Sequence, residues 1–400
     1  MSGDLLVINN GSSSLKFAVF APGAGADPDA LVLRCRGHFS GLGGARPHLL
    51  IRDGAGAVLT DEALATDGVF DQAAALQRLL VWLEAQSGFE RIAAIGHRVV
   101  HGGRDYRQPV RLDAETLDRL DALTPLAPLH QPNSLAPVRL LAALRPELPQ
   151  VACFDTSFHT RQSWVAQAYA LPRRLSEAGI VRYGFHGLSY EYVNRRLARQ
   201  LGRAETGRVV MAHLGQGASL CATRDGVSVA SSMGFTTLDG LPMGTRCGYL
   251  DPGVVLHLLQ QEGLTPEQVA RVLYHESGLL GVSGLSADMR VLLDSREDGA
   301  REAIELFVHR LVREIGALAA VLGGLDHLVF TAGIGEHAAP IRAAVGDGCA
   351  WLGLELDPAA NAAHSTRIST EAGRVGAWII PTDEERMIAH HTRCLCMDPD

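Results

Sequence analysis

The only lysine of the 400-residue chain, Lys16, follows the turn Gly11-Ser12-Ser13-Ser14, and the other 35 of the 36 lysines and arginines are arginines. Backbone N–H groups and hydroxyls of such a turn can converge on one anion. A compact ammonium beside them suits phosphate oxygens as a point charge, whereas a guanidinium is planar. A Walker A loop is excluded because its G-x-x-x-x-G-K-[ST] spacing is absent. The stretch favours a phosphate-binding hairpin; the alternative is a polar turn whose lysine was retained by chance.

Two arginines stand where they could hold anions. Arg98 lies in the apolar run "GHRVVHGG" before a Gly-Gly turn, and Arg246 lies in the Gly- and Pro-rich loop "GLPMGTRCGYLDPG". A buried charge needs a partner, so Arg98 either pairs with a structural carboxylate or binds a ligand anion. Bidentate contacts from two such arginines would suit a carboxylate and a phosphoryl group.

Three further residues have both a chemical and a structural interpretation. Asp155 ends the strand pattern "VACFD", where ligands of α/β sheets bind, or it caps the following turn. His186, in "RYGFHGLSY", is either a ligand-binding group or a packed core histidine. Glu384 opens the last helical pattern, either as a first-turn partner of the helix dipole or as a metal-bound carboxylate.

Two more Gly-rich turns, "HLGQGAS" and "FTAGIGEH", each follow a strand pattern. Glycine lets the backbone approach phosphates or a purine closely. Together with "NNGSSSLK", these turns occur on two half-chains. The three turns predict a nucleotide held in a cleft between two domains.

Hydrophobic periodicity predicts two similar halves that position these residues. The runs "LLVIN" and "LKFAVF" predict a hairpin, and "RVVMAHLGQGASLCATRDGVSVA" predicts a second one. Helical and strand patterns alternate after each hairpin, which predicts α/β domains with mixed sheets flanked by helices. We expect an N-terminal domain of residues 1–154 plus 386–400, with a returning last helix, and a nucleotide-binding domain of residues 155–385. Thr382 and Glu385 predict a capping box at the start of that last helix.

Composition excludes several classes of protein. The formal charge of −8, without a basic stripe, argues against a nucleic-acid partner. Neither a signal-peptide pattern nor an apolar run of roughly 18–20 residues is present, so no membrane association is expected. Seven scattered cysteines fit reduced thiols in the cytoplasm. Cys394 and Cys396 lie near His390 and His391, but no second ligand pair has matching spacing, so we expect no metal tract there.

The motifs taken together resemble the acetate kinases. Between residues 8 and 389 the chain contains, in the order of that family, "INNGSSSLKF", "GHRVVHGG", "FDTSFH", "RYGFHG", "HLGQGAS", "MGTRCGYLDPG", "SGLSADMR", "FTAGIGEH" and "IPTDEERMIA". The resemblance implies two duplicated actin-like, ribonuclease H-like domains with an active-site cleft between them. It also implies a cytoplasmic homodimer with its interface in the C-terminal domain. The reaction implied is reversible phosphoryl transfer between ATP and acetate, with Mg²⁺, or Mn²⁺ as an alternative.

The resemblance implies roles for single residues as well. Asn9 and Glu384 match the metal-associated pair, and Arg98 matches the ligand of the acetate carboxylate. Asp155, His186 and Arg246 match the catalytic positions. The nucleotide-binding positions implied are Ser12, Ser14, Lys16, His213, Leu214, Gly215, Gln216, Gly217, Asp288, Met289, Arg290, Gly333, Ile334, Gly335, Glu336 and His337.

The chemistry agrees with these roles. An acetate carboxylate is already anionic, so catalysis needs positioning and neutralisation of charge rather than a strong base. Asp155 is therefore expected to orient an arginine or a metal-bound water rather than to remove a proton. His186 and Arg246 are expected to stabilise the transition state.

The chain departs from the family pattern at five positions. Gln216 and His337 stand where the family usually has Asn, Leu188 and Tyr190 replace a Thr and a His, and Thr237 replaces a Pro of the acyl pocket. Preference for acetate is therefore open, and a propionate or other short-chain acyl kinase is one alternative. The others are an ATP-driven conformational protein like actin or the heat-shock 70 ATPase, and an inactive or diphosphate-using relative.

Overall fold

The computed structural model describes residues 3–11, 14–23, 25, 27–44, 46–64, 69–86, 92–128 and 130–397. The chain forms two compact units, a first unit of Met1–Ser157 with Asp383–Asp400 and a second unit of Phe158–Thr382. Asp155 and Glu384 thus belong to the first unit, whereas the sequence-based boundaries assigned both to the second. No helix among the described residues has the length and apolar character needed to span a bilayer.

The first unit is built on one mixed sheet whose strands, among the described residues, run in the order β5-β4-β3-β2-β1-β6-β8-β7. Strands β5 to β1 pair antiparallel, β1, β6 and β8 pair parallel, and β7 is antiparallel to β8. The elements are β1 (Asp4–Asn10), β2 (Leu15–Ala21), η1 (Pro28–Ala30), β3 (Val32–Ser40), β4 (His48–Asp53), β5 (Val58–Ala63), α1 (Gln72–Ala85), β6 (Ile92–Val99), β7 (Val110–Arg111), α2 (Ala114–Asp121), η3 (Thr124–Leu126), α3 (Gln131–Leu144), β8 (Gln150–Phe154) and α15 (Glu384–Cys396).

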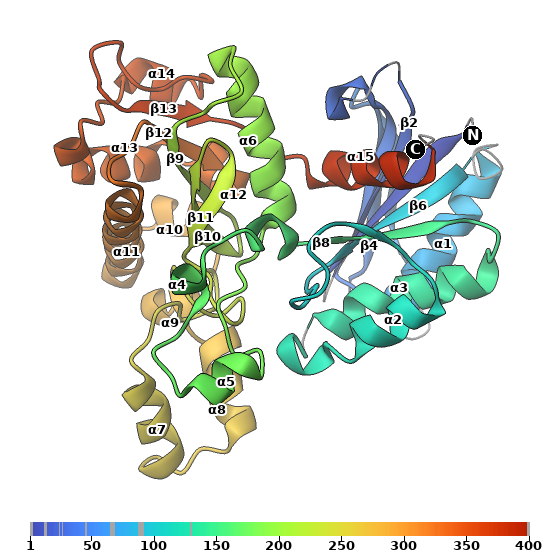
Figure 1. Cartoon of the computed structure of the whole chain (residues 1–400), viewed down its shortest axis with the longest axis horizontal. Helices are drawn as coiled ribbons and strands as arrows, with labels where there is room; N and C mark the ends of the chain where they lie inside the picture. The colour runs from blue at the N-terminus through green and yellow to red at the C-terminus, as the bar shows by residue number, and fades with distance from the viewer. Residues whose placement is uncertain are drawn as a thin grey trace. The chain divides into compact units, whose positions relative to one another are not determined.

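Helices cover both faces of the central strands. Successive side chains of a strand point to opposite faces, so Ile8 packs with the α1 and α3 core whereas Asn9 faces α15. Helix α15 packs on β1, β6 and β8, although more than 280 residues separate it from β6 along the chain. Figure 1 shows this red helix beside the blue strands of its unit. Gly96 makes the close approach possible, because a Cβ there would lie 2.2 Å from Thr392 Oγ1.

The second unit repeats the arrangement on a sheet of order β11-β10-β9-β12-β13. Strands β9, β10 and β11 form an antiparallel meander, and β9, β12 and β13 are parallel, just as β1, β2 and β3 precede the parallel β6 and β8. The elements are α4 (Trp164–Gln167), α5 (Arg173–Glu177), α6 (Gly187–Leu201), β9 (Arg208–Leu214), β10 (Ala218–Arg224), β11 (Val227–Ser231), α7 (Pro252–Gln260), α8 (Pro266–His275), α9 (Gly278–Ser283), α10 (Met289–Asp294), α11 (Asp298–Leu322), β12 (His327–Thr331), α12 (Ala332–His337), α13 (Ala339–Gly348), η5 (Ala350–Leu352), α14 (Pro358–Ala362) and β13 (Gly376–Ile379); η4 (Ser157–His159) spans the boundary between the units.

The predicted fold class is confirmed, since both units carry a mixed sheet flanked by helices. Both predicted hairpins are present as β1–β2 and β9–β10. In the second unit α6 packs on one face of the sheet through Val193, which lies with Met211 and Val329 in one buried cluster. Helix α11 also packs on β9 and β10.

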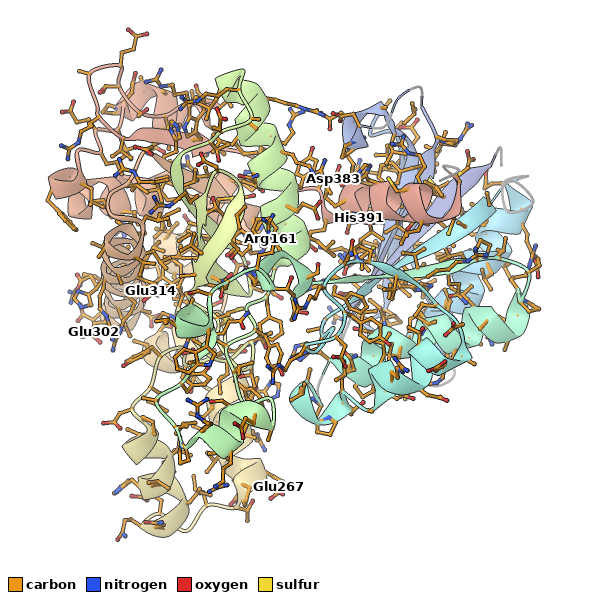
Figure 2. All side chains as sticks on the ribbon, in the orientation of Figure 1. Arg161, Glu267, Glu302, Glu314, Asp383 and His391 are labelled. Carbon is orange, nitrogen blue, oxygen red and sulfur yellow. The ribbon has the colours of Figure 1, made fainter. Side chains whose placement is uncertain are left out.

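The predicted capping box at Thr382 is wrong. Helix α15 begins at Glu384, and its N-cap is Asp383, whose carboxylate accepts from Arg386 N at 3.1 Å; Figure 2 labels Asp383 just before the helix. A carboxylate at the N-cap also benefits from the helix dipole. Glu385 does not turn back to the cap but accepts from Asn9 Nδ2 at 3.0 Å.

Candidate active site

Four predicted residues of the first unit meet at the carboxyl edge of its parallel strands. Asn9 lies near the end of β1, Arg98 near the end of β6, Asp155 directly after β8, and Glu384 at the first position of α15. Parallel strands bring their carboxyl ends to one edge of a sheet, which is where α/β folds bind ligands. Arg98 pairs in register with Cys153, so Asp155, two residues further on, projects from the same face.

Arg98 and Asp155 form a two-pronged ion pair. Arg98 Nε donates to Asp155 Oδ1 at 2.9 Å, and Nη2 donates to Oδ2 at 2.5 Å. The Asp155 side chain is 2 % exposed and that of Arg98 is 21 % exposed. Burial alone would lower the pKa of Arg98, but Asp155 and Glu384 outweigh it and hold the pKa above its ordinary value. Both carboxylate oxygens of Asp155 are therefore engaged in fixing the guanidinium.

The remaining guanidinium nitrogen of Arg98, Nη1, contacts the predicted metal residues. Arg98 Nη1 donates to Asn9 Oδ1 at 3.3 Å, and Asn9 Nδ2 donates to Glu384 Oε2 at 3.3 Å. Among the described residues, no group of three or more Asp, Glu, His or Cys side chains could cage a metal. A carboxylate and an amide oxygen are ligand types that suit Mg²⁺, since that ion keeps several waters and takes its remaining ligands from substrate phosphates. The Asn9 amide would have to turn its oxygen from Arg98 towards Glu384 to join such a site.

Charges around Glu384 act in both directions. Burial raises the pKa of its carboxyl, and so do Asp155 and Glu385, whereas Arg98 and Lys16 lower it; the net shift is upward. A divalent cation at this carboxylate would reverse that shift, because it stabilises the ionised form. The exposed Lys16 lies opposite Asn9 in the β1–β2 register and so shares its face.

The hairpin turn before Lys16 is only partly described. Gly11 N donates to Ser14 O at 2.8 Å, which closes the turn. The predicted phosphate-binding Ser12 lies outside the described residues.

In the second unit, His186 lies at the N-cap of α6. Its backbone is left-handed (φ 58°), a conformation that is uncommon for a residue with a side chain. Its ring stacks on that of His213, with centroids 4.2 Å apart, and its Nδ1 lies 2.8 Å from Ser219 Oγ. His213, at the end of β9, is held in turn through Nδ1 by Ser189 Oγ at 2.8 Å.

The turn after β9 lies beside His186 and Arg246. A Cβ at Gly217 would lie 3.3 Å from His186 Nε2 and 3.8 Å from Arg246 Nη1. The turn is tied to the arginine loop because Gly244 N donates to Gln216 O at 3.2 Å. Arg246 Nη1 donates to Thr237 O at 3.2 Å. Leu214 ends β9 as a fully buried residue, and Gly215 N closes the turn on Gly217 O at 3.0 Å.

The "GIGEH" segment is a short helix, α12, rather than the predicted turn. It begins at Ala332, which is left-handed (φ 63°) and lies beside Gly215, 3.7 Å from a Cβ built there. Strands β9 and β12 pair with Thr331 opposite His213, so their two following segments start at one edge. Glu336 Oε1 accepts from Ala332 N at 2.8 Å, and the side chain of His337 is 76 % exposed.

The remaining predicted nucleotide residues open α10. Asp288 caps this helix, the exposed Arg290 donates to Asp288 Oδ2 at 2.6 Å, and Met289 is buried. The preceding residue, Ala287, lies beside Gly244 in the arginine loop, because a Cβ at Gly244 would be 3.3 Å from the Ala287 carbonyl. The structure therefore brings three predicted segments of the second unit into one neighbourhood.

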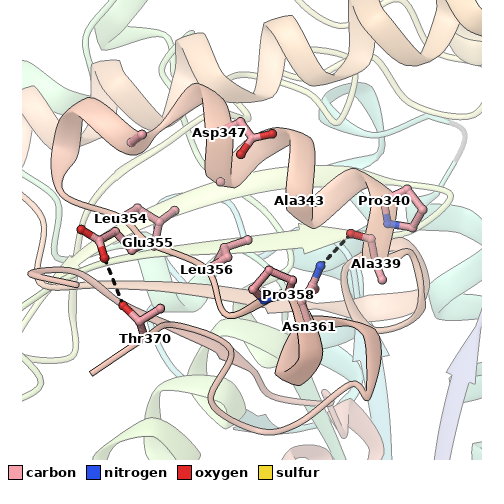
Figure 3. A pocket seen from close by; sticks show the side chains of 12 residues that line it. Ala339, Pro340, Ala343, Asp347, Leu354, Glu355, Leu356, Pro358, Asn361 and Thr370 are labelled. Atoms are coloured by element: carbon pink, nitrogen blue, oxygen red, sulfur yellow. Dashed lines mark hydrogen bonds between the residues drawn. The ribbon is translucent and has the colours of Figure 1, made fainter. Parts of the chain in front are cut away.

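A pocket of about 620 Å³ lies elsewhere in the second unit, between α13, α14 and residues 354–356. Figure 3 shows Asn361 donating to the Ala339 carbonyl and Thr370 donating to Glu355 at its edge. None of the predicted site residues lines it, so this pocket is not the predicted nucleotide site.

Sequence reasoning missed several supporting residues. Ser189 and Ser219 orient the two histidines, and Glu385 binds Asn9. Ser189 follows His186 by three residues, a spacing that places both on one helix face. Ser219 carries no such signal, because its contact depends on the pairing of β10 with β9.

Comparison with known proteins links this geometry to one family. The model of the acetokinase family matches residues 4–390. An acetate kinase from Rhodopseudomonas palustris is 53% identical over 394 residues, 98% of each chain. An acetate kinase from Rhizobium meliloti is 50% identical over 396 residues, 99% of each chain.

Solved structures give the same result. A propionate kinase from Francisella tularensis superimposes with a TM-score of 0.91 at 35% identity, covering 99% of this chain and 100% of that one. An acetate kinase from Porphyromonas gingivalis superimposes with a TM-score of 0.87 at 34% identity, covering 98% and 100%.

Proposed function

The chain belongs to the acetokinase family, and from this premise we propose that it transfers the γ-phosphoryl group of ATP reversibly to acetate, giving acetyl phosphate and ADP. It is a phosphotransferase. The observation that carries the assignment is the Arg98 guanidinium, which Asp155 holds beside the Asn9–Glu384 pair at the carboxyl edge of the sheet. A fixed cation next to a metal-binding pair suits a small carboxylate that must meet a metal-bound phosphate.

Asp155 acts as a positioning group in this mechanism. Its two oxygens accept from Arg98 Nε and Nη2, so the guanidinium cannot rotate away from the acetate carboxylate. No general base is required, because the attacking carboxylate oxygen already carries negative charge. Holding that oxygen in line with the phosphorus converts a bimolecular encounter into an oriented reaction.

In this mechanism, residues of the second unit and the bound cation stabilise the negative charge that develops on the transferring phosphoryl group. His186 and Arg246 supply N–H donors from fixed positions, so they need no reorganisation during transfer. Asn9 and Glu384 would hold Mg²⁺, which neutralises phosphate charge when bound. Ser14 and Lys16, with Ser12, would face the phosphates.

The nucleotide would lie along the turns of the second unit. The segment His213–Gly217, the start of α10 from Asp288 to Arg290, and α12 from Gly333 to His337 are the proposed ATP contacts. Support comes from the small residues of these turns and from the neighbourhood that they share. By resemblance to the family we also propose Mg²⁺ over Mn²⁺, a homodimer joined through the second unit, and a cytoplasmic location.

A second candidate is a propionate or other short-chain acyl kinase. One similar structure is that of a propionate kinase. In this chain Thr237 replaces the usual Pro, and its carbonyl accepts from Arg246. One methylene in a binding pocket changes binding by only about 1–3 kcal/mol, so the preference can be partial.

The test is acyl-hydroxamate formation from Mg-ATP with acetate, propionate and butyrate as acceptors. We expect acetate to have the highest kcat/KM; a preference of about tenfold for propionate would move the assignment to the second candidate. ATP turnover without any acid would favour the conformational class of protein. Replacing ATP with diphosphate in the same assay tests the diphosphate-using alternative.

The lone lysine is tested by Lys16→Arg in the same assay. Collapse of activity would support a phosphate-binding role for its compact ammonium. Unchanged activity would keep the assignment and remove that role.

A further inference from the structure

Three side chains of the second unit form a continuous hydrogen-bonded chain that ends at His186. The Tyr190 hydroxyl lies 2.5 Å from Ser219 Oγ, and Ser219 Oγ lies 2.8 Å from His186 Nδ1. Tyr190 and Ser219 are both completely buried. Only His186 reaches the Gly217 turn, where its Nε2 lies 3.3 Å from the position of a Cβ.

Local structure fixes this geometry. Tyr190 follows His186 by one helical turn, and its N–H donates to the His186 carbonyl at 3.0 Å, so both side chains project from one face of α6. Ser219 lies on β10, opposite His213 of β9, beneath that face. The Tyr190 ring packs with Val193 and Met211 in the buried cluster of the second unit, which leaves its hydroxyl little freedom to move.

The number of protons that the three side chains can donate decides the direction of the hydrogen bonds between them. Each hydroxyl has one proton to donate. Among the described residues, Ser219 is the only hydrogen-bond partner of the Tyr190 hydroxyl, so Tyr190 donates to Ser219. The Ser219 proton is then directed to His186 Nδ1, which must accept it.

The opposite direction is unfavourable. A proton on His186 Nδ1 would donate to Ser219, Ser219 would donate to Tyr190, and the Tyr190 proton would be left without an acceptor in the core. A buried donor without an acceptor loses its hydrogen bond to water and gains none in return, so this arrangement is disfavoured. Burial raises the pKa of Tyr190 well above its ordinary value, so its hydroxyl keeps its proton.

We propose that Tyr190 and Ser219 are positioning residues that hold His186 as a neutral imidazole with its proton on Nε2. Nε2 is then a permanent hydrogen-bond donor that faces Gly217 and binds an anionic oxygen. That this oxygen belongs to the transferring phosphoryl group rests on the proposed function. We call the hydrogen-bonded chain of Tyr190, Ser219 and His186 the relay; by the resemblance, Tyr190 stands where the family usually has a His.

The primary test is the ¹⁵N NMR spectrum of the full chain labelled at histidine, with His186→Asn used to assign the His186 signal. We expect the neutral Nε2–H tautomer at pH 7.5, and a mixture of tautomers in Tyr190→Phe, which removes only the hydroxyl. A wild-type His186 that is protonated on Nδ1, alone or with Nε2, would overturn the proposal. So would an unchanged His186 spectrum in Tyr190→Phe.

Kinetics supplies the second measurement. Tyr190→Phe should lower kcat by about tenfold while KM for ATP and acetate changes less than about twofold. The reason is that the variant weakens the His186 Nε2–H donor, which acts in the transition state. Ser219→Ala should lower kcat further, because Nδ1 then loses its direct partner. The matched control is Tyr183→Phe, which removes another buried hydroxyl, bonded to Gly179 O at 2.8 Å, without touching the relay.

The control separates positioning from stability. If Tyr183→Phe lowers kcat as much as Tyr190→Phe, the effect is general destabilisation and the relay is refuted. The NMR experiment needs no substrate, so failure of the proposed function would appear as absent turnover with the Nε2–H tautomer intact. Failure of the relay would appear as turnover with another tautomer.

Discussion

At the scale of single residues, the molecule fixes its charged groups with other charged groups. Asp155 is almost completely buried, and both of its oxygens are occupied by one guanidinium. Removing one member of a buried ion pair is costlier than the pair is stabilising, because the partner is left with an uncompensated charge. The geometry of Arg98 therefore depends on Asp155 more than on any contact with solvent.

Asp155→Asn tests this dependence. An amide offers one acceptor oxygen and turns an N–H group towards the guanidinium. Arg98 therefore loses one of its two hydrogen bonds to residue 155 and the attraction of the negative charge. We expect kcat/KM for acetate to fall by about 100-fold or more, with a smaller change in KM for ATP. Steady-state kinetics with each substrate varied measures both.

Asp4→Asn is the matched control. Asp4 is also a buried carboxylate that pairs with an arginine, Arg34 at 2.9 Å, but it lies at the opposite end of β1. The activity of the Asp4→Asn variant should stay close to that of the wild type. Full activity in Asp155→Asn would contradict the positioning role.

At the scale of elements, short segments of weak intrinsic preference are held by buried side chains. Helix α12 contains two glycines in six residues, which disfavours a helix. The completely buried Arg342 donates from Nη1 to the carbonyls of Gly335 and Glu336, both at 2.9 Å, at the carboxyl end of this helix. Burial lowers the pKa of Arg342 to about 10, so it remains charged at neutral pH and favours the negative end of the helix dipole.

Arg342→Met should therefore loosen α12. Hydrogen bonds to a charged group contribute about 1.5–3 kcal/mol each, and the freed carbonyls would stay buried, so we expect a loss of at least about 3 kcal/mol in unfolding free energy. KM for ATP should rise several-fold if α12 contacts the nucleotide. Urea unfolding and ATP kinetics measure the two effects.

Arg301→Met provides the comparison. Among the described residues, the ion-pair partners of Arg301 are the exposed Asp298 and Glu305 on α11, so its loss should leave the unfolding free energy almost unchanged. A destabilised Arg342→Met protein with an unchanged KM for ATP would exclude α12 from the nucleotide site.

The docking of α15 gives a second prediction at this scale. A Cβ at Gly96 would lie 2.2 Å from Thr392 Oγ1 and 2.6 Å from Ile388 Cγ2, so Gly96→Ala must displace the helix that carries Glu384. Overpacking of this kind costs about 1–3 kcal/mol, and activity should fall together with stability. Thermal unfolding and the hydroxamate assay are the measurements.

Gly316→Ala is the control for Gly96→Ala. At this α11 position the nearest atom that the new Cβ meets outside the helix, in the described part of the chain, belongs to Trp351 at an ordinary 3.4 Å, and alanine suits a helix better than glycine. Stability should be equal or slightly higher. Equal behaviour of the two variants would show that α15 tolerates the added methyl group.

At the scale of the whole molecule, both units contain one sheet plan, a three-stranded meander followed by two parallel strands, which the first unit extends with β4, β5 and β7. The first unit also buries two neutral histidines close to its site. Burial lowers the pKa of His97 and of His101 to about 4. His97 Nε2 lies 2.7 Å from Gln150 Oε1, and His101 Nδ1 accepts from Gly103 N at 2.8 Å.

These histidines predict an acid-sensitive first unit. Unfolded histidine has a pKa of 6.5, above the folded value of about 4, so the unfolded chain binds more protons between these limits. The contribution of each neutral histidine to the unfolding free energy is fully present above pH 6.5. It falls as the pH drops towards 4, by roughly 3 kcal/mol for each group. Urea unfolding between pH 7.5 and 4.5 should show this loss, and His97→Gln should reduce it; a flat profile over that range would contradict the prediction.

The sequence predicted the elements better than their contacts. Both hairpins were predictable because buried β-rich runs flank short polar turns, and the carboxyl-edge position of Asp155 followed from the end of its strand. The partner of Arg98 stayed open, because Asp155 is 57 residues away and only the β6–β8 register brings them together. The cap of α15 was misplaced because Thr382 and Asp383 are adjacent acceptors, and α12 was missed because its support comes from Arg342.

Helix α15 has a consequence for how the protein is made. Residues 383–397 leave the ribosome only after the entire second unit has been synthesised, so one face of β1, β6 and β8 waits uncovered until then. The carboxylate proposed for the metal, Glu384, arrives on the same helix. From the end of β8 at Phe154 until α15 is made, a nascent chain thus carries an uncovered sheet face and lacks the carboxylate proposed for the metal. The step that buries this face also brings Glu384 to the proposed site.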